Sequence, residues 1–454
     1  MDRRELLKRS GAITAGAALA GGAVPVAGLG VAAVAAQDTE FDVWSTWTDE
    51  IRANLITAVG DAFASENGLT FAHRAWALEE LQDTLPRTVD SDQGPDVSQV
   101  NNGESLMGPM ARAGQILSLA EYDAEYGWSD RFAAGLLARC MYPADGSTFG
   151  EGELWGLPVE SEIVGFYYNK EVFADNGLSV PTTFEEFEAL LASLRGAGVE
   201  PLVFGNLDKW QAIHLFGEIH GTNTTREYLD GLIYRRGNAD FTDPSILAAA
   251  QKVIEWNDAG FFMEGFDGVS GDDAQALFIT GVGGVLLQGS WAAGAVRDGL
   301  GENAGFFLMP PSGSVGAATP VSMEATPVVS PAVLHVGGVG IPFGITANAA
   351  DPAVAAAFID AMVSEETFAS FVEAGLLPLG EISEDMIVPD TVQGDLYSAW
   401  NSAVAADAIG HYMDWAAPGF YDPFTAALQE LLGGQVTAEE FQASIQEFYA
   451  ASFE

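Results

Sequence analysis

Short apolar runs alternate with longer amphipathic segments at the start of the chain. Phe41–Trp47 and Leu69–Trp76 read as strands, and a third strand begins near Val97. The segment from Thr48 to about Ser65 has helical periodicity and is followed by Asn67-Gly68, a usual helix stop. This strand–helix alternation predicts a mostly parallel sheet covered by helices.

A second region with the same kind of pattern begins after Leu154. Ile163–Tyr168 is an apolar strand and Gly283–Leu287 a buried one. Pro181–Phe187 opens a helix, because a threonine N-cap with a glutamate near the third helical position fits a capping box. Thr437–Tyr449 closes the chain as an amphipathic helix. The fold class expected from both regions is α/β.

Residues 1–37 differ in composition from the rest and predict an export signal. A positive start is followed by an uncharged stretch rich in Ala, Gly and Val, and Ala33-Val34-Ala35 offers a small-x-small cleavage site. The Arg3-Arg4 pair with Leu6-Leu7-Lys8 resembles the twin-arginine signal; an ordinary Sec signal is the alternative. We expect the mature protein in the periplasm or at the extracellular face of the cytoplasmic membrane.

The charge of the chain is strongly negative. Its 454 residues contain 18 Lys and Arg against 64 Asp and Glu, a net charge of −46. Nucleic acids and anionic lipids need a basic surface, so neither is an expected partner. Two explanations of the acidity stay open: solubility in concentrated salt, and an acidic patch made for a partner. The single Cys140 excludes an internal disulfide framework.

Motifs of the common enzyme classes are missing from the sequence. There is no Gly-x-Ser-x-Gly elbow, no phosphate loop and no His-Glu-x-x-His pair, and the five histidines are widely spaced. We therefore expect no catalytic residues, no cofactor and no metal. A secreted glycosidase stays open as an alternative, because two suitably spaced carboxylates would be enough.

Four blocks of residues follow one another in a characteristic order. They are Trp155-Gly156-Leu157-Pro158 with Tyr167–Phe173 and Pro181–Phe187, then Phe278-Ile279-Thr280-Gly281 with Gly289-Ser290-Trp291, then Gly338 to Ser364, and finally Gly433-Gly434 before the last helix. In this order and spacing, most of residues 41–454 resembles the family 1 extracellular solute-binding proteins. That family comprises the sugar-binding subunits of ABC importers and includes maltose-binding protein.

The resemblance implies a two-lobed α/β fold, the periplasmic-binding-protein fold, with three interlobe crossings and a ligand cleft. The lobes would close on the ligand by hinge motion. Carried over to this chain, the crossings fall near Glu160, Ile341 and Gly380. The lobes implied are 41–159 plus 343–379 for lobe 1, and 160–340 plus 381–454 for lobe 2.

The resemblance also implies a function. The protein would capture a carbohydrate, which we expect to be an oligosaccharide, and deliver it to the membrane permease subunits of an ABC transporter. We expect a monomer that leaves its ligand chemically unchanged. Binding of a non-sugar solute, such as a polyamine or a metal chelate, stays open as an alternative because an acidic chain could favour a cation.

A sugar site needs aromatic plates for the ring faces and planar polar groups for the hydroxyls. Residues at predicted strand ends, in loops and at the first crossing supply both kinds, some of them at positions that match sugar contacts in the family. The candidate ligand-binding residues are Thr46, Trp47, Asn101, Asn102, Glu160, Glu162, Trp210, Trp291, Trp415 and Tyr421, with backbone amides from Gly337-Gly338.

The net charge generates a prediction on stability. We expect the melting temperature to rise as NaCl is increased from about 0.1 M to about 1 M, because salt screens the repulsion among the carboxylates. Differential scanning calorimetry across this series measures the effect. A melting temperature independent of salt would contradict the prediction.

Overall fold

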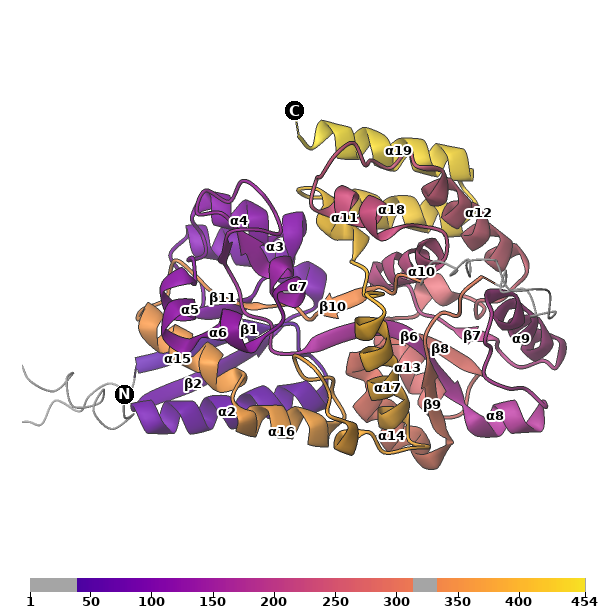
Figure 1. The fold of residues 1–454 in the computed structure, drawn as a ribbon, viewed down its shortest axis with the longest axis horizontal. Helices are drawn as coiled ribbons and strands as arrows, with labels where there is room; N and C mark the ends of the chain where they lie inside the picture. The colour runs from indigo at the N-terminus through magenta and orange to yellow at the C-terminus, as the bar shows by residue number, and fades with distance from the viewer. Residues whose placement is uncertain (1–38, 313–332, 454) are drawn as a thin grey trace, which may run out of the picture. The chain divides into compact units, whose positions relative to one another are not determined.

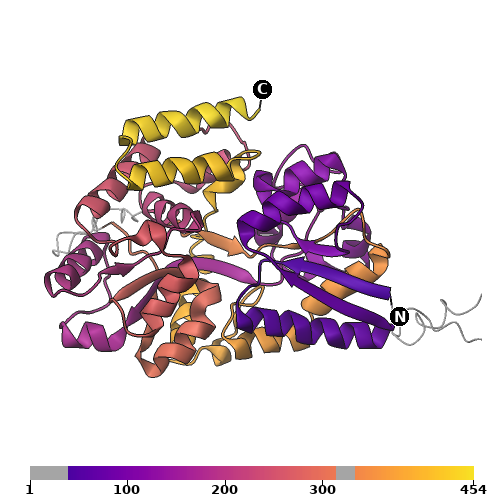
Figure 2. The same cartoon turned by 180° about the vertical axis from the view of Figure 1, so that it is seen from behind.

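The computed structural model describes residues 39–312 and 333–453 and contains two main β-sheets (Figures 1 and 2). The predicted export signal at 1–37 lies outside the described residues. Among the residues described, no helix is both long enough and apolar enough to cross a membrane.

The first sheet has the strand order β11-β3-β1-β2, with β1 at Thr39–Ser45, β2 at Leu69–Ala75, β3 at Val97–Gln99 and β11 at Phe343–Ile345. β1 pairs in parallel with β2 and β3, and only β11 runs antiparallel, which confirms the mostly parallel arrangement expected here. The ends of β1, β2 and β3 therefore meet at one edge of the sheet.

The second sheet has the order β10-β6-β8-β7, and β9 also pairs with β6. Its strands are β6 (Ser161–Asn169), β7 (Leu202–Val203), β8 (Val285–Gly289), β9 (Ala304–Phe307) and β10 (Gly337–Val339). Only β7 and β8 pair in parallel. The parallel pattern thus does not extend to this sheet. β6 enters it from the first lobe and β10 leaves it toward that lobe, so these two strands must run in opposite directions.

Helices cover both sheets, and a two-stranded sheet of β4 (Met141–Tyr142) and β5 (Glu153–Leu154) lies apart from them. The helices of the first lobe are α2 (Glu50–Asn67), α3 (Leu78–Asp90), α4 (Met107–Ala113), α5 (Ala120–Tyr126), α6 (Trp128–Arg131), α7 (Ala134–Leu137), α15 (Pro352–Met362) and α16 (Glu365–Ala374). α2 and α16 lie side by side in both views (Figures 1 and 2).

The second lobe is richer in helices. They are α8 (Lys170–Asp175), α9 (Phe184–Gly196), α10 (Trp210–Gly221), α11 (Arg226–Ile233), α12 (Pro244–Asp258), α13 (Gly271–Ile279), α14 (Ala293–Leu300), α17 (Val392–Ala405), α18 (Tyr421–Leu432) and α19 (Ala438–Ala451). Two 3-10 helices also bear on the site, η1 (Gly103–Ser105) and η7 (Met413–Ala416).

The two predicted threonine caps differ in detail. Thr437 caps α19 with a complete capping box: its hydroxyl accepts from the backbone N–H of Glu440, and the Glu440 carboxylate accepts from the backbone N–H of Thr437. Thr183 also caps α9, but the Glu186 carboxylate accepts from the backbone and hydroxyl of Thr182 instead. The second box is therefore shifted by one residue.

The three connections between the sheets lie next to one another, near the predicted crossings. The backbone N–H of Gly340 donates to the carbonyl of Glu160 (3.0 Å), and that of Ser161 donates to the carbonyl of Leu377 (2.9 Å). Figure 1 shows β6 and β10 reaching from one group of elements toward the other. The two-lobed α/β fold is thereby confirmed, whereas the exact residue ranges of the lobes stay a prediction.

Candidate ligand-binding site

Two cavities of similar size lie among the described residues. One has a volume of about 710 Å³, and the ring side chains on its walls are Trp76, Trp210, His214, Trp291, Tyr412, Trp415 and Tyr421. We refer to it as the aromatic cavity. The other has a volume of about 750 Å³ and is lined by Arg131, Arg139, Arg226 and Arg236. We refer to it as the arginine cavity.

Five rings of the aromatic cavity form a continuous wall. The ring centroids of Trp210 and Trp291 are 5.9 Å apart, edge to face. His214 lies 4.9 Å from Trp210 and 5.2 Å from Tyr412, and Tyr412 lies 5.1 Å from Trp415. Burial lowers the pKa of His214 to about 3, so this ring is uncharged at neutral pH. The wall is therefore an apolar surface that suits the face of a sugar ring.

Trp291 reaches this wall because the residue two positions before it, at the end of β8, is the glycine Gly289. A β-carbon at Gly289 would lie 2.0 Å from the Trp291 ring, so a larger residue there would displace the indole. Trp291 and Trp210 are both partly exposed, and their surfaces are open to a ligand.

Polar groups at the edge of the first sheet line the same cavity as the aromatic wall. Thr46 follows β1, and both its N–H (2.6 Å) and its hydroxyl (2.8 Å) donate to Oε1 of Gln99. Asn101 and Asn102 follow β3 on the same edge. The Nδ2 of Asn102 donates to the carbonyl of Arg139, but its buried Oδ1 has no partner among the described residues. A ligand hydroxyl can satisfy an acceptor of this kind.

Carboxylates complete the polar side of the cavity. Asp414, on η7, accepts from the hydroxyl of Ser105 (2.8 Å) and from Nδ2 of Asn101 (3.4 Å). Burial raises the pKa of Asp414 to about 6. Glu162 accepts from the hydroxyl of Tyr412 (2.9 Å), and burial likewise raises its pKa.

The sequence matches a known family over much of this region. Residues 77–367 match the model of the bacterial extracellular solute-binding proteins. The chain belongs to this family. The match includes β3 and β11 of the first sheet and all strands of the second, and with them Trp210, Trp291 and Glu162 from the walls of the aromatic cavity.

Relatives and solved structures agree with this assignment. The Multiple sugar-binding protein of Streptococcus mutans is 23% identical over 158 residues, which are 32% of this chain and 35% of that protein. The alignment thus spans about a third of that relative's length. A chitin oligosaccharide binding protein superposes with a TM-score of 0.76 at 23% identity, covering 91% of this chain and 99% of the other. The GacH receptor of Streptomyces glaucescens, solved with acarbose, gives 0.69 at 18%, with 91% and 97% covered. The structures establish a shared fold.

Eight of the ten candidate residues of this solute-binding protein line the aromatic cavity, and Trp47 and Glu160 do not. The Trp47 side chain is 0% exposed and packs edge-on against Phe343 (5.5 Å) and Phe371 (6.0 Å). The prediction that Trp47 lines the cleft is therefore wrong. Thr46 lines the cavity, whereas the side chain of Trp47 points into the core, because consecutive residues at the end of a strand point to opposite faces of the sheet.

Glu160 is one step removed from the cavity, behind Arg52. It is 3% exposed, and its carboxylate lies 3.4 Å from the Arg52 guanidinium, which itself lines the cavity. Burial raises the pKa of Glu160 despite this partner. The prediction that Glu160 lines the cleft is therefore also wrong, because Arg52 lies between its carboxyl group and the cavity.

The backbone amides of Gly337-Gly338 are also not on the cavity wall. Both residues pair with β6, and a β-carbon at Gly338 would lie 2.4 Å from Nε of Arg139. The glycines serve close packing at a crossing strand. By contrast, two aromatic residues of the cavity wall were not predicted from the sequence. Trp76 follows β2 at the same edge as Thr46, and Tyr412 lies three positions before Trp415. The strand-end position was a usable signal for Trp76.

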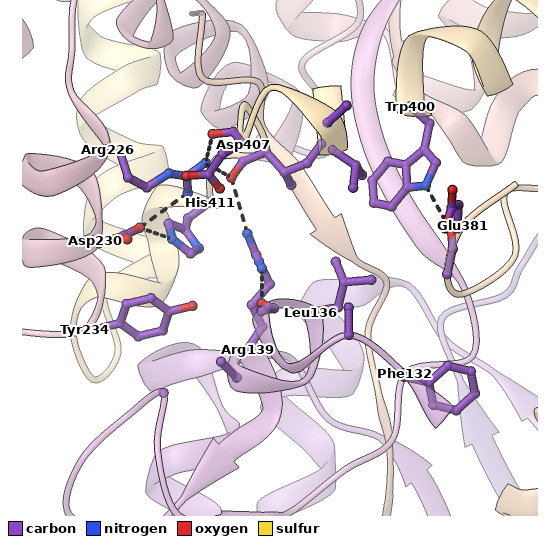
Figure 3. A pocket seen from close by; sticks show the side chains of 18 of the residues that line it. Phe132, Leu136, Arg139, Arg226, Asp230, Tyr234, Glu381, Trp400, Asp407 and His411 are labelled. Atoms are coloured by element: carbon purple, nitrogen blue, oxygen red, sulfur yellow. Dashed lines mark hydrogen bonds and ion pairs between the residues drawn. The ribbon is translucent and has the colours of Figure 1, made fainter. Parts of the chain in front are cut away.

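Several polar groups of the arginine cavity bond to each other (Figure 3), whereas the Nε atoms of Arg139 and Arg226 and Nδ1 of His411 have no partner among the described residues. Arg139 and Arg226 both donate to the carbonyl of Ile409, at 3.4 Å and 2.6 Å. Asp230 lies 3.4 Å from Arg226 and 2.8 Å from Nε2 of His411. These bonds tie the first lobe to the segment after α17. The aromatic cavity, with its partly exposed rings, is the better candidate for the ligand of this solute-binding protein.

Asp414 generates a prediction on pH and stability. Because its folded pKa is raised, the folded protein binds a proton that the unfolded chain has released between the ordinary Asp value and about pH 6, and stability falls as pH rises through this range. Asp414→Asn should therefore be more stable than wild type at neutral pH, by up to about 3 kcal/mol, and equal to it near pH 4.

Calorimetric melting across pH measures the difference. Glu439→Gln, which removes an exposed acid in the first turn of α19, is the control. Identical pH profiles of wild type and Asp414→Asn would refute the assignment.

Proposed function

We propose that this protein captures a carbohydrate in the aromatic cavity and delivers it, chemically unchanged, to the membrane permease subunits of an ABC transporter. The observation that carries the proposal is the continuous wall of aromatic rings opposite polar strand-end residues. The family assignment and the sugar-binding relatives support it.

The two sides of the cavity suit the two kinds of surface on a sugar. Partly exposed Trp210 and Trp291 offer planes for the C–H faces, and Asn101, Asn102 and Glu162 offer acceptors for hydroxyls. The rings extend over several elements within about 710 Å³, which favours an oligosaccharide over a single ring. Nothing in this arrangement requires a covalent step.

The remaining parts of the proposal concern location and assembly. An export signal over 1–37, of the twin-arginine type, would place the mature protein in the periplasm or at the outer face of the cytoplasmic membrane. The protein would act as a monomer whose only macromolecular partner is the permease. The net charge of −46 supports the absence of nucleic acid partners.

A calorimetric titration against mono- and oligosaccharides, with polyamines as a second series, tests the function. We expect saturable 1:1 binding of an oligosaccharide, and chromatography of the released ligand should show it intact. Shortened glycans would support the glycosidase alternative. Binding of polyamines without any sugar would support the non-sugar alternative.

Trp291 is the residue with which to test the site. Trp291→Ala should weaken sugar binding at least tenfold, about 1.4 kcal/mol, because it removes the ring surface that follows β8. Trp256→Phe is the matched control, since Trp256 is buried in α12 and does not line the cavity. Unchanged affinity in Trp291→Ala would defeat the assignment of this wall as the binding surface.

A further inference from the structure

Carboxylates are concentrated around the aromatic cavity beyond the average of the chain. Nine of its 29 lining residues are Asp or Glu, whereas the whole chain has 64 in 454. Roughly one residue in three is acidic on the cavity wall, against one in seven overall. The general acidity of the chain does not account for this difference.

The cavity has one basic lining residue, Arg52, which already has two carboxyl partners. The guanidinium lies 2.6 Å from the Asp49 carboxylate and 3.4 Å from that of Glu160. Its side chain is 13% exposed. Of the other carboxylates on the wall, Glu79 pairs with Lys209 (3.7 Å) and Asp298 with Arg297 (2.9 Å). Asp414 and Glu162 form no ion pair with a lysine or arginine among the described residues.

Asp414 and Glu162 accept hydrogen bonds from uncharged donors. Asp414 is 5% exposed, and its partners are the hydroxyl of Ser105 and the amide of Asn101. The partner of Glu162 is the hydroxyl of Tyr412. A carboxylate removed from water without a cation is costly, so the wall is incomplete without a positive group.

Aromatic faces lie beside these carboxylates. The ring of Tyr412, whose hydroxyl bonds Glu162, is 5.1 Å from the ring of Trp415, the residue after Asp414. Aromatic faces attract cations as well as sugar C–H groups. In addition, the unpartnered Oδ1 of Asn102 calls for a hydrogen-bond donor, which a hydroxyl or an ammonium group supplies.

The arginine cavity provides an internal contrast. Four arginines line it, of which Figure 3 labels Arg139 and Arg226, whereas the aromatic cavity of similar volume has one. Basic side chains are thus common around the arginine cavity and scarce around the aromatic cavity.

We propose that the preferred ligand of the aromatic cavity is an oligosaccharide that carries protonated amino groups, and that the same cavity rejects sugars bearing carboxylates or phosphates. The inference rests on the proposed function and adds the charge class of the ligand. The sugar faces lie on the aromatic wall, and the ammonium groups neutralise the carboxylates of Asp414 and Glu162.

Three oligosaccharides of equal length test the proposal by isothermal titration calorimetry: a glucosamine oligomer, its fully N-acetylated counterpart and an oligogalacturonate. The pH is set above the pKa of Asp414, about 6, so that more than half of this carboxyl group is ionised while the sugar amines still carry protons. We expect the amino oligomer to bind at least tenfold tighter than the N-acetylated one and the oligogalacturonate not to bind. The tenfold preference should shrink as salt is added.

The possible outcomes distinguish failure of the charge preference from failure of sugar capture itself. Equal affinity for the amino and N-acetylated oligomers, or binding of the oligogalacturonate, overturns the charge preference and leaves sugar capture intact. Failure of all oligosaccharides in the wider sugar screen overturns the proposed function. Binding of a polyamine without any sugar overturns both.

Two variants assign the preference to named residues. Asp414→Asn and Glu162→Gln each remove one carboxylate from the wall, so the affinity ratio between amino and N-acetylated oligomers should fall at least threefold. Glu439→Gln, on the exposed side of α19, is the control and should keep the wild-type ratio. A ratio within one variant is independent of its folded fraction, and melting curves confirm folding. An unchanged ratio in both cavity variants would overturn the assignment.

Discussion

The backbone pairing of the three crossing segments is the constraint on which the site depends. The carbonyl of Glu160 accepts from Gly340, and the N–H of the next residue, Ser161, donates to Leu377. This pairing holds the two sheets so that the polar strand ends of the first sheet and the aromatic residues of the second lobe line the same aromatic cavity. Without this pairing, Thr46 and Trp291 would belong to separate surfaces and neither would define a site alone.

Periodicity and turn signals were sufficient for most elements of the fold. The first three strands and the caps at Thr183 and Thr437 follow from local sequence, since each depends on residues within a few positions. Strand direction in the second sheet does not follow from local sequence. β6 pairs with strands that begin more than a hundred residues later, and no local signal reports that partner.

The candidate site was predictable where strand ends were clear. Thr46 and the Asn101-Asn102 pair follow β1 and β3 and reach the cavity, whereas Trp47 turns into the core because one position decides the side on which a side chain lies. Asp414 gave no comparable signal. It lies on η7, a single 3-10 turn, and its importance comes from contacts with residues about 310 positions earlier.

Gln99 connects the candidate contact residue Thr46 to one of the crossings. Its Oε1 accepts from the backbone and hydroxyl of Thr46, and its Nε2 donates to the carbonyl of Ile341 at 3.1 Å. A ligand that bonds to the Thr46 hydroxyl would therefore be linked to the interlobe crossing at Ile341 through the side-chain amide of Gln99. The path from the ligand to this crossing therefore consists of two side chains, Thr46 and Gln99, and ends at the backbone of Ile341, so occupancy of the cavity would bear directly on the geometry of the hinge.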